Sequence, residues 1–89
     1  MNTINMLIAH FGGSPIIPME NAAEYLRYKP DTLKQKILRG EIRLAAFSIE
    51  SDSQKAQKFV KLADLAELID EHYQVAKQDF DVLWEERGR

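Results

Sequence analysis

A long helical pattern of apolar residues occupies the last third of this 89-residue chain. No glycine or proline interrupts the pattern before Gly88. The apolar residues recur at spacings of three and four, which is the spacing of one face of an α-helix. They are Leu62, Leu65, Ala66, Ile69, Tyr73, Ala76, Phe80, Leu83 and Trp84. A chain this short closes only one modest core. We therefore expect a single domain over residues 1–89, in which residues 62–89 form a C-terminal helix.

Glycine and proline divide the preceding part of the chain into short segments. Apolar residues between Ile4 and Phe11 have helical spacing, so residues 1–14 are predicted to contain an N-terminal helix. Thr3 is its expected N-cap, and Gly12-Gly13 its expected end. The prolines at both ends of residues 15–18 indicate an extended connector.

Two more helices and a hairpin are predicted within residues 15–61. The segment "MENAAEYL" favours a short helix, and Pro30 is well placed to begin the next one, which should end at Gly40. Alternating apolar residues from Ile42 to Ala46, and the later segment "KFVKL", favour two strands. The polar residues between these strands predict a loop that projects from a small hairpin.

Charge is distributed unevenly along the chain, although the formal net charge is only -2. Residues 25–61 contain nine lysines and arginines against four acidic residues, a net charge of +5. The remaining residues contain three basic and ten acidic residues, a net charge of -7. A basic middle of this kind favours a polyanionic partner. The alternative is a solvated helix face with no partner.

This order of elements and this charge are typical of a winged helix-turn-helix domain that binds double-stranded DNA. The expected fold class is therefore mainly α with a small β-hairpin, in which residues 15–61 form the helix-turn-helix and the wing. The predicted base contacts come from the helix that follows Pro30, and are Thr32, Gln35, Lys36 and Arg39. The predicted phosphate contacts at its ends are Lys29 and Arg43, and the predicted wing contacts are Ser53, Gln54, Lys55 and Lys58.

A resemblance to known regulators supports this prediction. The run "IIPMENAAEYLRYKPDTLKQKILRGEIRL" is similar to helix-turn-helix regulators of the excisionase and MerR type. Together with Asn2-Thr3, "FGG", "SQKA" and "LADLAELID", it resembles the pyocin activator (PrtN) family more closely, over roughly residues 2–73. The resemblance implies a transcriptional activator of bacteriocin or prophage genes that binds a promoter element. It draws attention to Lys36, Gly40, Glu41 and the loop Ser53–Ala56.

The expected mechanism is promoter binding followed by contact with RNA polymerase. An excisionase-like architectural factor, which bends DNA, is one alternative. A protein-interaction module without DNA binding is another. The apolar spacing of the last helix also predicts a homodimer through a heptad-like seam. The residues of this seam are Ile69, Tyr73, Ala76, Phe80 and Leu83.

The residue types argue against several other functions. The chain contains no cysteine, and His10 and His72 are isolated in the sequence, so we expect no metal site and no cofactor. No arrangement of nucleophile and base is recognisable, and we expect neither an enzyme nor a small-molecule substrate. No signal peptide or membrane span is predicted. The expected localisation is cytoplasmic and nucleoid-associated.

Overall fold

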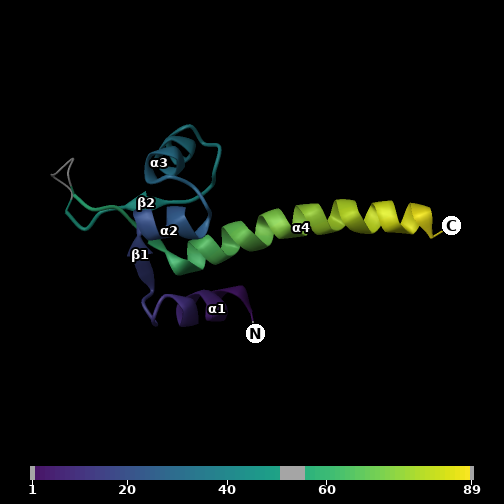
Figure 1. Cartoon of the computed structure of the whole chain (residues 1–89), viewed down its shortest axis with the longest axis horizontal. Helices are drawn as coiled ribbons and strands as arrows, with labels where there is room; N and C mark the ends of the chain where they lie inside the picture. The colour runs from purple at the N-terminus through teal and green to yellow at the C-terminus, as the bar shows by residue number, and fades with distance from the viewer. Residues whose placement is uncertain (1, 51–55, 89) are drawn as a thin grey trace.

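The computed structural model describes residues 2–50 and 56–88. Within these residues the chain forms four helices and three short strands (Figure 1). In chain order they are α1 (Thr3–His10), β1 (Ile16–Pro18), α2 (Met19–Tyr25), α3 (Pro30–Leu38), β2 (Ala46–Phe47), β3 (Phe59–Lys61) and α4 (Leu62–Arg87). This confirms the prediction of a mainly α protein with a small β component and a long C-terminal helix.

Helix α1 is capped one residue earlier than predicted. The side chain of Asn2 accepts a hydrogen bond from the backbone N–H of Asn5 at 2.9 Å, so Asn2 is the N-cap and the assignment of Thr3 was wrong. Thr3 instead lies in the first turn, where its hydroxyl donates to a carboxylate oxygen of Asp70 on α4 at 2.6 Å. The predicted glycine end is confirmed. Gly12 and Gly13 have φ values of 73° and 89°, which glycine adopts without steric cost.

The strands form an antiparallel sheet in the order β1-β3-β2. The expected connector between the prolines is in fact an edge strand, in which Ile17 lies opposite Val60. Proline is tolerated there because it has no backbone N–H, and the outer side of an edge strand forms no hydrogen bonds to another strand.

The strand predicted within the segment "EIRLAAFSI" is present but short, because only Ala46 and Phe47 form β2 and the alternating residues Ile42 and Leu44 lie outside it. The backbone N–H groups of Glu41 and Ile42 donate to the carbonyl of Lys36 at the end of α3. These local bonds replace the pairing with β3 that a longer strand would require.

One hydrophobic core joins these elements. Leu7 of α1, Leu33 of α3, Val60 of β3 and Leu65 of α4 are almost completely buried. In the part of the chain that the structure describes, no polar or charged residue is buried. The core therefore depends on apolar packing, in which α2 contacts α3 and the strands β1 and β3, while α1 contacts α4.

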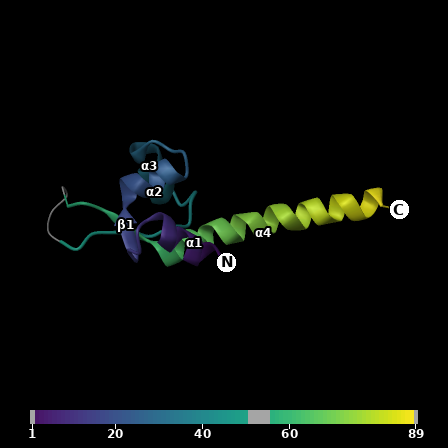
Figure 2. The same cartoon turned by 60° about the horizontal axis from the view of Figure 1, so that its bottom comes forward.

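Helix α4 leaves the core after its first turns. Its buried residues lie between Leu62 and Leu68, and in Figures 1 and 2 the rest of the helix extends away from the other elements. Lys77 donates a hydrogen bond to Asp81 one turn later, which raises the pKa of Lys77.

Among the described helices, none combines the length and the apolar character that a membrane crossing would need.

Candidate nucleic-acid interface

Helices α2 and α3 are joined by a tight turn. Arg27 adopts the left-handed conformation, with φ of 67°, and the N–H of Tyr28 donates to the carbonyl of Ala23 at 2.8 Å. Pro30 then occupies the first turn of α3, as predicted, where its missing N–H has no intrahelical partner to lose. On α3, Leu33 is fully buried. The turn and this anchor fix which side of α3 is exposed.

The exposed side of α3 is polar and basic. Thr32, Gln35 and Arg39 are all exposed, as is Lys29 immediately before the helix. The structure therefore brings four of the predicted contact residues together on α3 and its two caps, because Lys29 is the N-cap and Arg39 the C-cap. Leu38 differs from the expectation that it would lie beside Leu33 and Ile37, because 69% of its surface is exposed.

Lys36 is held by neighbours within the protein. Its ammonium group lies 3.7 Å from a carboxylate oxygen of Glu41 and 5.8 Å from the centre of the Tyr28 ring. The Lys36 side chain is 35% exposed. An ion pair and a cation–π contact both favour this position. Glu41, which the resemblance singled out, thus lies at the corner after α3 and contacts the side chain of Lys36.

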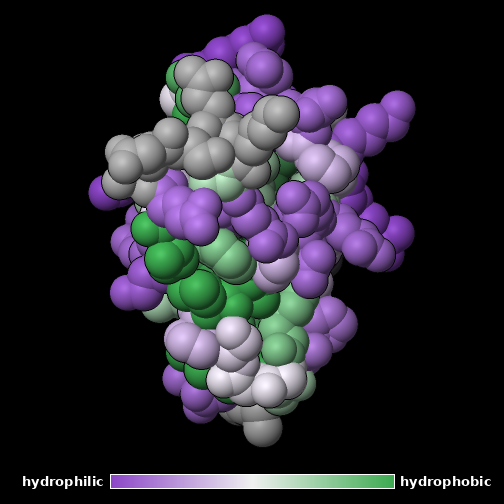
Figure 3. All heavy atoms as spheres, turned by 90° about the vertical axis from the view of Figure 1, so that its left-hand side faces the viewer, coloured by the Kyte–Doolittle hydropathy of each residue, from purple (hydrophilic) through white to green (hydrophobic). Residues whose placement is uncertain are grey.

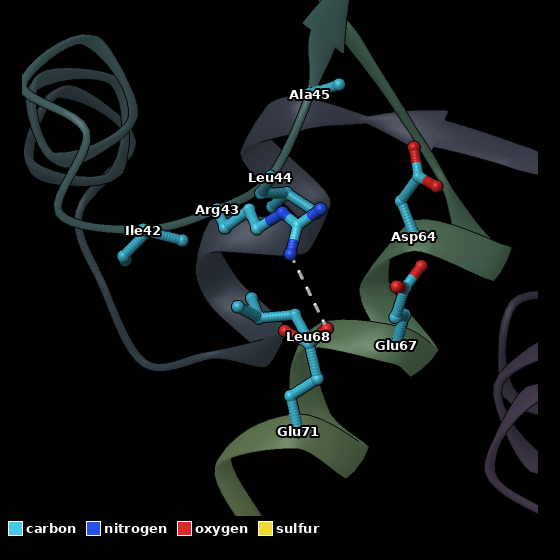
Figure 4. A pocket seen from close by; sticks show the side chains of 8 residues that line it. All are labelled: Ile42, Arg43, Leu44, Ala45, Asp64, Glu67, Leu68 and Glu71. Carbon is cyan, nitrogen blue, oxygen red and sulfur yellow. Dashed lines mark ion pairs between the residues drawn. The ribbon is translucent and has the colours of Figure 1, made fainter.

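Arg43 lies away from α3, against α4. Its guanidinium group is 3.8 Å from a carboxylate oxygen of Glu71. Figure 4 shows it in a groove between the segment that follows α3 and the first turns of α4, with Asp64 and Glu67 on the same helix. The Arg43 side chain is 86% exposed, so this pair is a surface ion pair of small net stability.

The base of the β2–β3 hairpin lies close to the beginning of α3. Lys58 and Gln57 line a shallow hollow together with Asp31 and Lys34 of α3 and Glu20 of α2. Lys58 is exposed. The other predicted wing residues, Ser53, Gln54 and Lys55, lie outside the described residues.

The hydropathy of the surface changes across the end of the molecule that carries the hairpin. Figure 3 shows hydrophilic side chains over the upper part, on the side where α3 lies in Figure 1. Hydrophobic side chains gather below them. Polar recognition is therefore favoured on the α3 side of this end.

The family comparison covers the elements from α1 to β3 and the first part of α4. The model of the family described as pyocin activator protein PrtN matches residues 3–76. This chain belongs to the PrtN family. The match includes α3, the hairpin and the first part of α4, whereas Phe80, Leu83 and Trp84 lie beyond it. Comparison with curated proteins found no match, and comparison with solved structures found none.

The predicted seam of this PrtN family member divides into two parts. Ile69 packs against the core of its own domain. Tyr73, Ala76, Phe80 and Leu83 are exposed. Self-association through α4 would therefore begin near Tyr73 rather than at Ile69.

Sequence reasoning missed Lys34 as a candidate contact. The helical wheel placed Thr32, Gln35, Lys36 and Arg39 on the polar side, but it did not show which elements lie beside that side. Lys34 is exposed and faces the hollow shared with the hairpin base. Its position in the basic segment was the only signal in the sequence.

No group of three or more histidine, cysteine, aspartate or glutamate residues suited to a metal ion occurs within residues 2–50 and 56–88.

Proposed function

We propose that this protein is a DNA-binding transcriptional activator of bacteriocin or prophage genes. In this proposal α2, the turn and α3 form a helix-turn-helix, and the β2–β3 hairpin forms its wing. Membership of the PrtN family supports the activator role. The observation that carries the proposal is the polar, basic side of α3, which is exposed beside the base of the hairpin.

The proposed mechanism follows from the shape of a helix and the chemistry of its exposed side. An α-helix fits the major groove of B-DNA, where arginine and lysine donate to guanine and glutamine pairs with adenine. Arg39 and Gln35 are suited to these base contacts, and Lys36 is a further candidate. Lys29 and Arg43 are proposed to contact phosphates, as are the wing residues. Contact with RNA polymerase then follows promoter binding, and the protein acts at the nucleoid.

We also propose that the active form is a homodimer. Tyr73, Phe80 and Leu83 are 57%, 49% and 51% exposed, and with Ala76 they repeat at alternating spacings of three and four. A helix segment without tertiary contacts is marginally stable in water, so it gains from packing against a second copy. Two copies would bind half-sites about 34 Å apart, one helical turn of DNA.

The first experiment measures binding of the intact protein to genomic fragments over a series of salt concentrations, with random duplex for comparison. Selection of particular fragments with a steep salt dependence is expected. Weak and unselective binding would contradict the proposal. For a fragment that is selected, a promoter reporter and a bending assay distinguish an activator from an excisionase-like factor.

A matched pair of arginine variants then tests the contact made by α3. We expect Arg39→Ala to weaken binding to the selected fragment by about 1–3 kcal/mol, the usual discrimination of a good base contact. Lys36→Ala is expected to weaken it as well. Arg87→Ala removes the same charge from the far end of α4 and should leave the affinity unchanged. Unchanged affinity in both Arg39→Ala and Lys36→Ala would exclude α3 as the element that recognises bases.

A further inference from the structure

The hollow between α3 and the hairpin base contains a lysine from each element. Lys34 lies one turn into α3, and Lys58 lies immediately before β3. Both side chains are exposed. Neither forms an ion pair with any residue that the structure describes. Two lysines from different elements of the sequence are thus available on one shallow surface.

The charges that line this hollow balance one another. Glu20 of α2 and Asp31 of α3 line it together with the two lysines. Asp31 lies in the first turn of α3, where the helix dipole stabilises a carboxylate. Because the two carboxylates repel a polyanion, the hollow attracts a phosphate only where that phosphate lies close to a lysine. The distance of each phosphate from the lysines, rather than the overall charge of the hollow, then decides whether this surface binds it.

Two other predicted contacts are less available than this pair of lysines. Lys36 is engaged by Glu41 and Tyr28, and Arg43 is paired with Glu71 of α4. A phosphate at Lys36 would compete with both of its contacts, whereas one at Arg43 would meet the nearby Glu71 carboxylate in a weak surface pair. Lys34 and Lys58 have no such competing contact among the described residues.

We infer that Lys34 and Lys58 bind backbone phosphates of the duplex, with one DNA strand passing over the hollow between α3 and the wing. This inference rests on the proposed function. It deepens that function, because it assigns a phosphate contact to Lys34, and places its partner contact at the base of the hairpin rather than at its tip. The two contacts fix how far α3 enters the major groove, and they carry no base preference themselves.

The test compares the salt dependence of binding for Lys34→Ala, Lys58→Ala and the double variant with that of the unaltered protein. Each phosphate contact contributes about 0.9 to the slope of log K against log salt concentration. We expect each single variant to lose about that much of the slope and the double variant about twice as much. The ranking of selected and random fragments should stay the same in all three variants.

Lys61→Ala is the matched control. It removes the same charge from β3 at the residue opposite Ile16, outside the hollow. Its slope is expected to stay that of the unaltered protein. Glu20→Gln should have the opposite effect to the lysine variants and strengthen binding to both kinds of fragment. All the altered side chains are exposed, and circular dichroism verifies that the fold is retained.

The outcomes separate this inference from the proposed function. If the unaltered protein shows no salt-dependent DNA binding, the proposed function fails. If it binds but both lysine variants keep its slope, the phosphate contacts are refuted while DNA binding stands. A slope loss in Lys61→Ala equal to that in Lys58→Ala would also refute them, because the effect would then reflect overall charge. A changed ranking of fragments in Lys34→Ala would overturn the assignment of Lys34 to phosphate.

Discussion

The two leucines of α3 have opposite environments. Leu33 is completely buried, whereas Leu38 is 69% exposed. Leu33→Ala should lower the free energy of unfolding by about 2–5 kcal/mol, because it removes packed methyl groups and leaves a cavity. Leu38→Ala should change it by no more than about 0.5 kcal/mol. Urea unfolding followed by circular dichroism measures both values.

The comparison of these two variants tests the packing of α3 directly. Both remove the same atoms from the same helix, so the two variants are matched in the side chain that they lose. Equal destabilisation by the two substitutions would show that α3 is packed differently from the arrangement described above.

The environments of individual charged residues were the least predictable feature. The helical wheel placed Lys36 correctly on the polar side of α3. It could not show that Glu41 and Tyr28 would contact the Lys36 ammonium group, because both partners lie outside the helix. The pairing of Arg43 with Glu71 likewise joins residues that are distant in the sequence. A contact between such distant residues leaves no local pattern for sequence analysis to detect.

Helices were predicted well because their signals are local. Periodic apolar residues, Pro30 and the glycines after α1 and α3 identified all four helices, and only the cap of α1 was misplaced. Strand β1 was missed because it is held by hydrogen bonds to β3, which lies more than forty residues later in the chain. Pro15 immediately before it and Pro18 at its end also indicated a connector rather than a strand.

At the scale of a single element, α4 permits a test of the proposed dimer. The double variant Phe80→Ala/Leu83→Ala removes two large side chains of the seam and is expected to convert a dimer into a monomer. Val82→Ala is the control. Val82 is 52% exposed and lies about 100° around the helix from Leu83, away from the seam. It should leave the dimer intact.

Sedimentation equilibrium of the intact chain and both variants gives the association constants. A chain truncated before Gln74 should behave like the double variant. If the truncated and intact chains have the same oligomeric state, α4 is not the interface. A monomeric Val82→Ala variant would instead place the contact on another side of the helix.

At the scale of the whole molecule, opposite charges lie toward opposite ends. Within α4, eight acidic residues face two basic ones, while residues 25–61 carry a net charge of +5. The longest dimension is 60 Å, and Figure 1 shows the hairpin and the C-terminal end of α4 at its two extremes. The acidic end is far from the proposed DNA surface. Its repulsion of DNA should therefore be felt only at low salt, where charges are screened weakly.

The neutralised variant Asp81→Asn/Glu85→Gln tests this long-range repulsion. It should bind random duplex more tightly than the unaltered protein at about 10 mM salt, where the screening length is near 30 Å. At about 150 mM salt this length falls to about 8 Å, and the difference should disappear. Glu20→Gln, beside the proposed DNA surface, should strengthen binding at both concentrations. Fluorescence anisotropy with a labelled random duplex measures all three proteins. A gain in affinity from the α4 substitutions that persists at about 150 mM salt would contradict this prediction. It would mean that the acidic end of α4 lies close to the bound DNA in the complex.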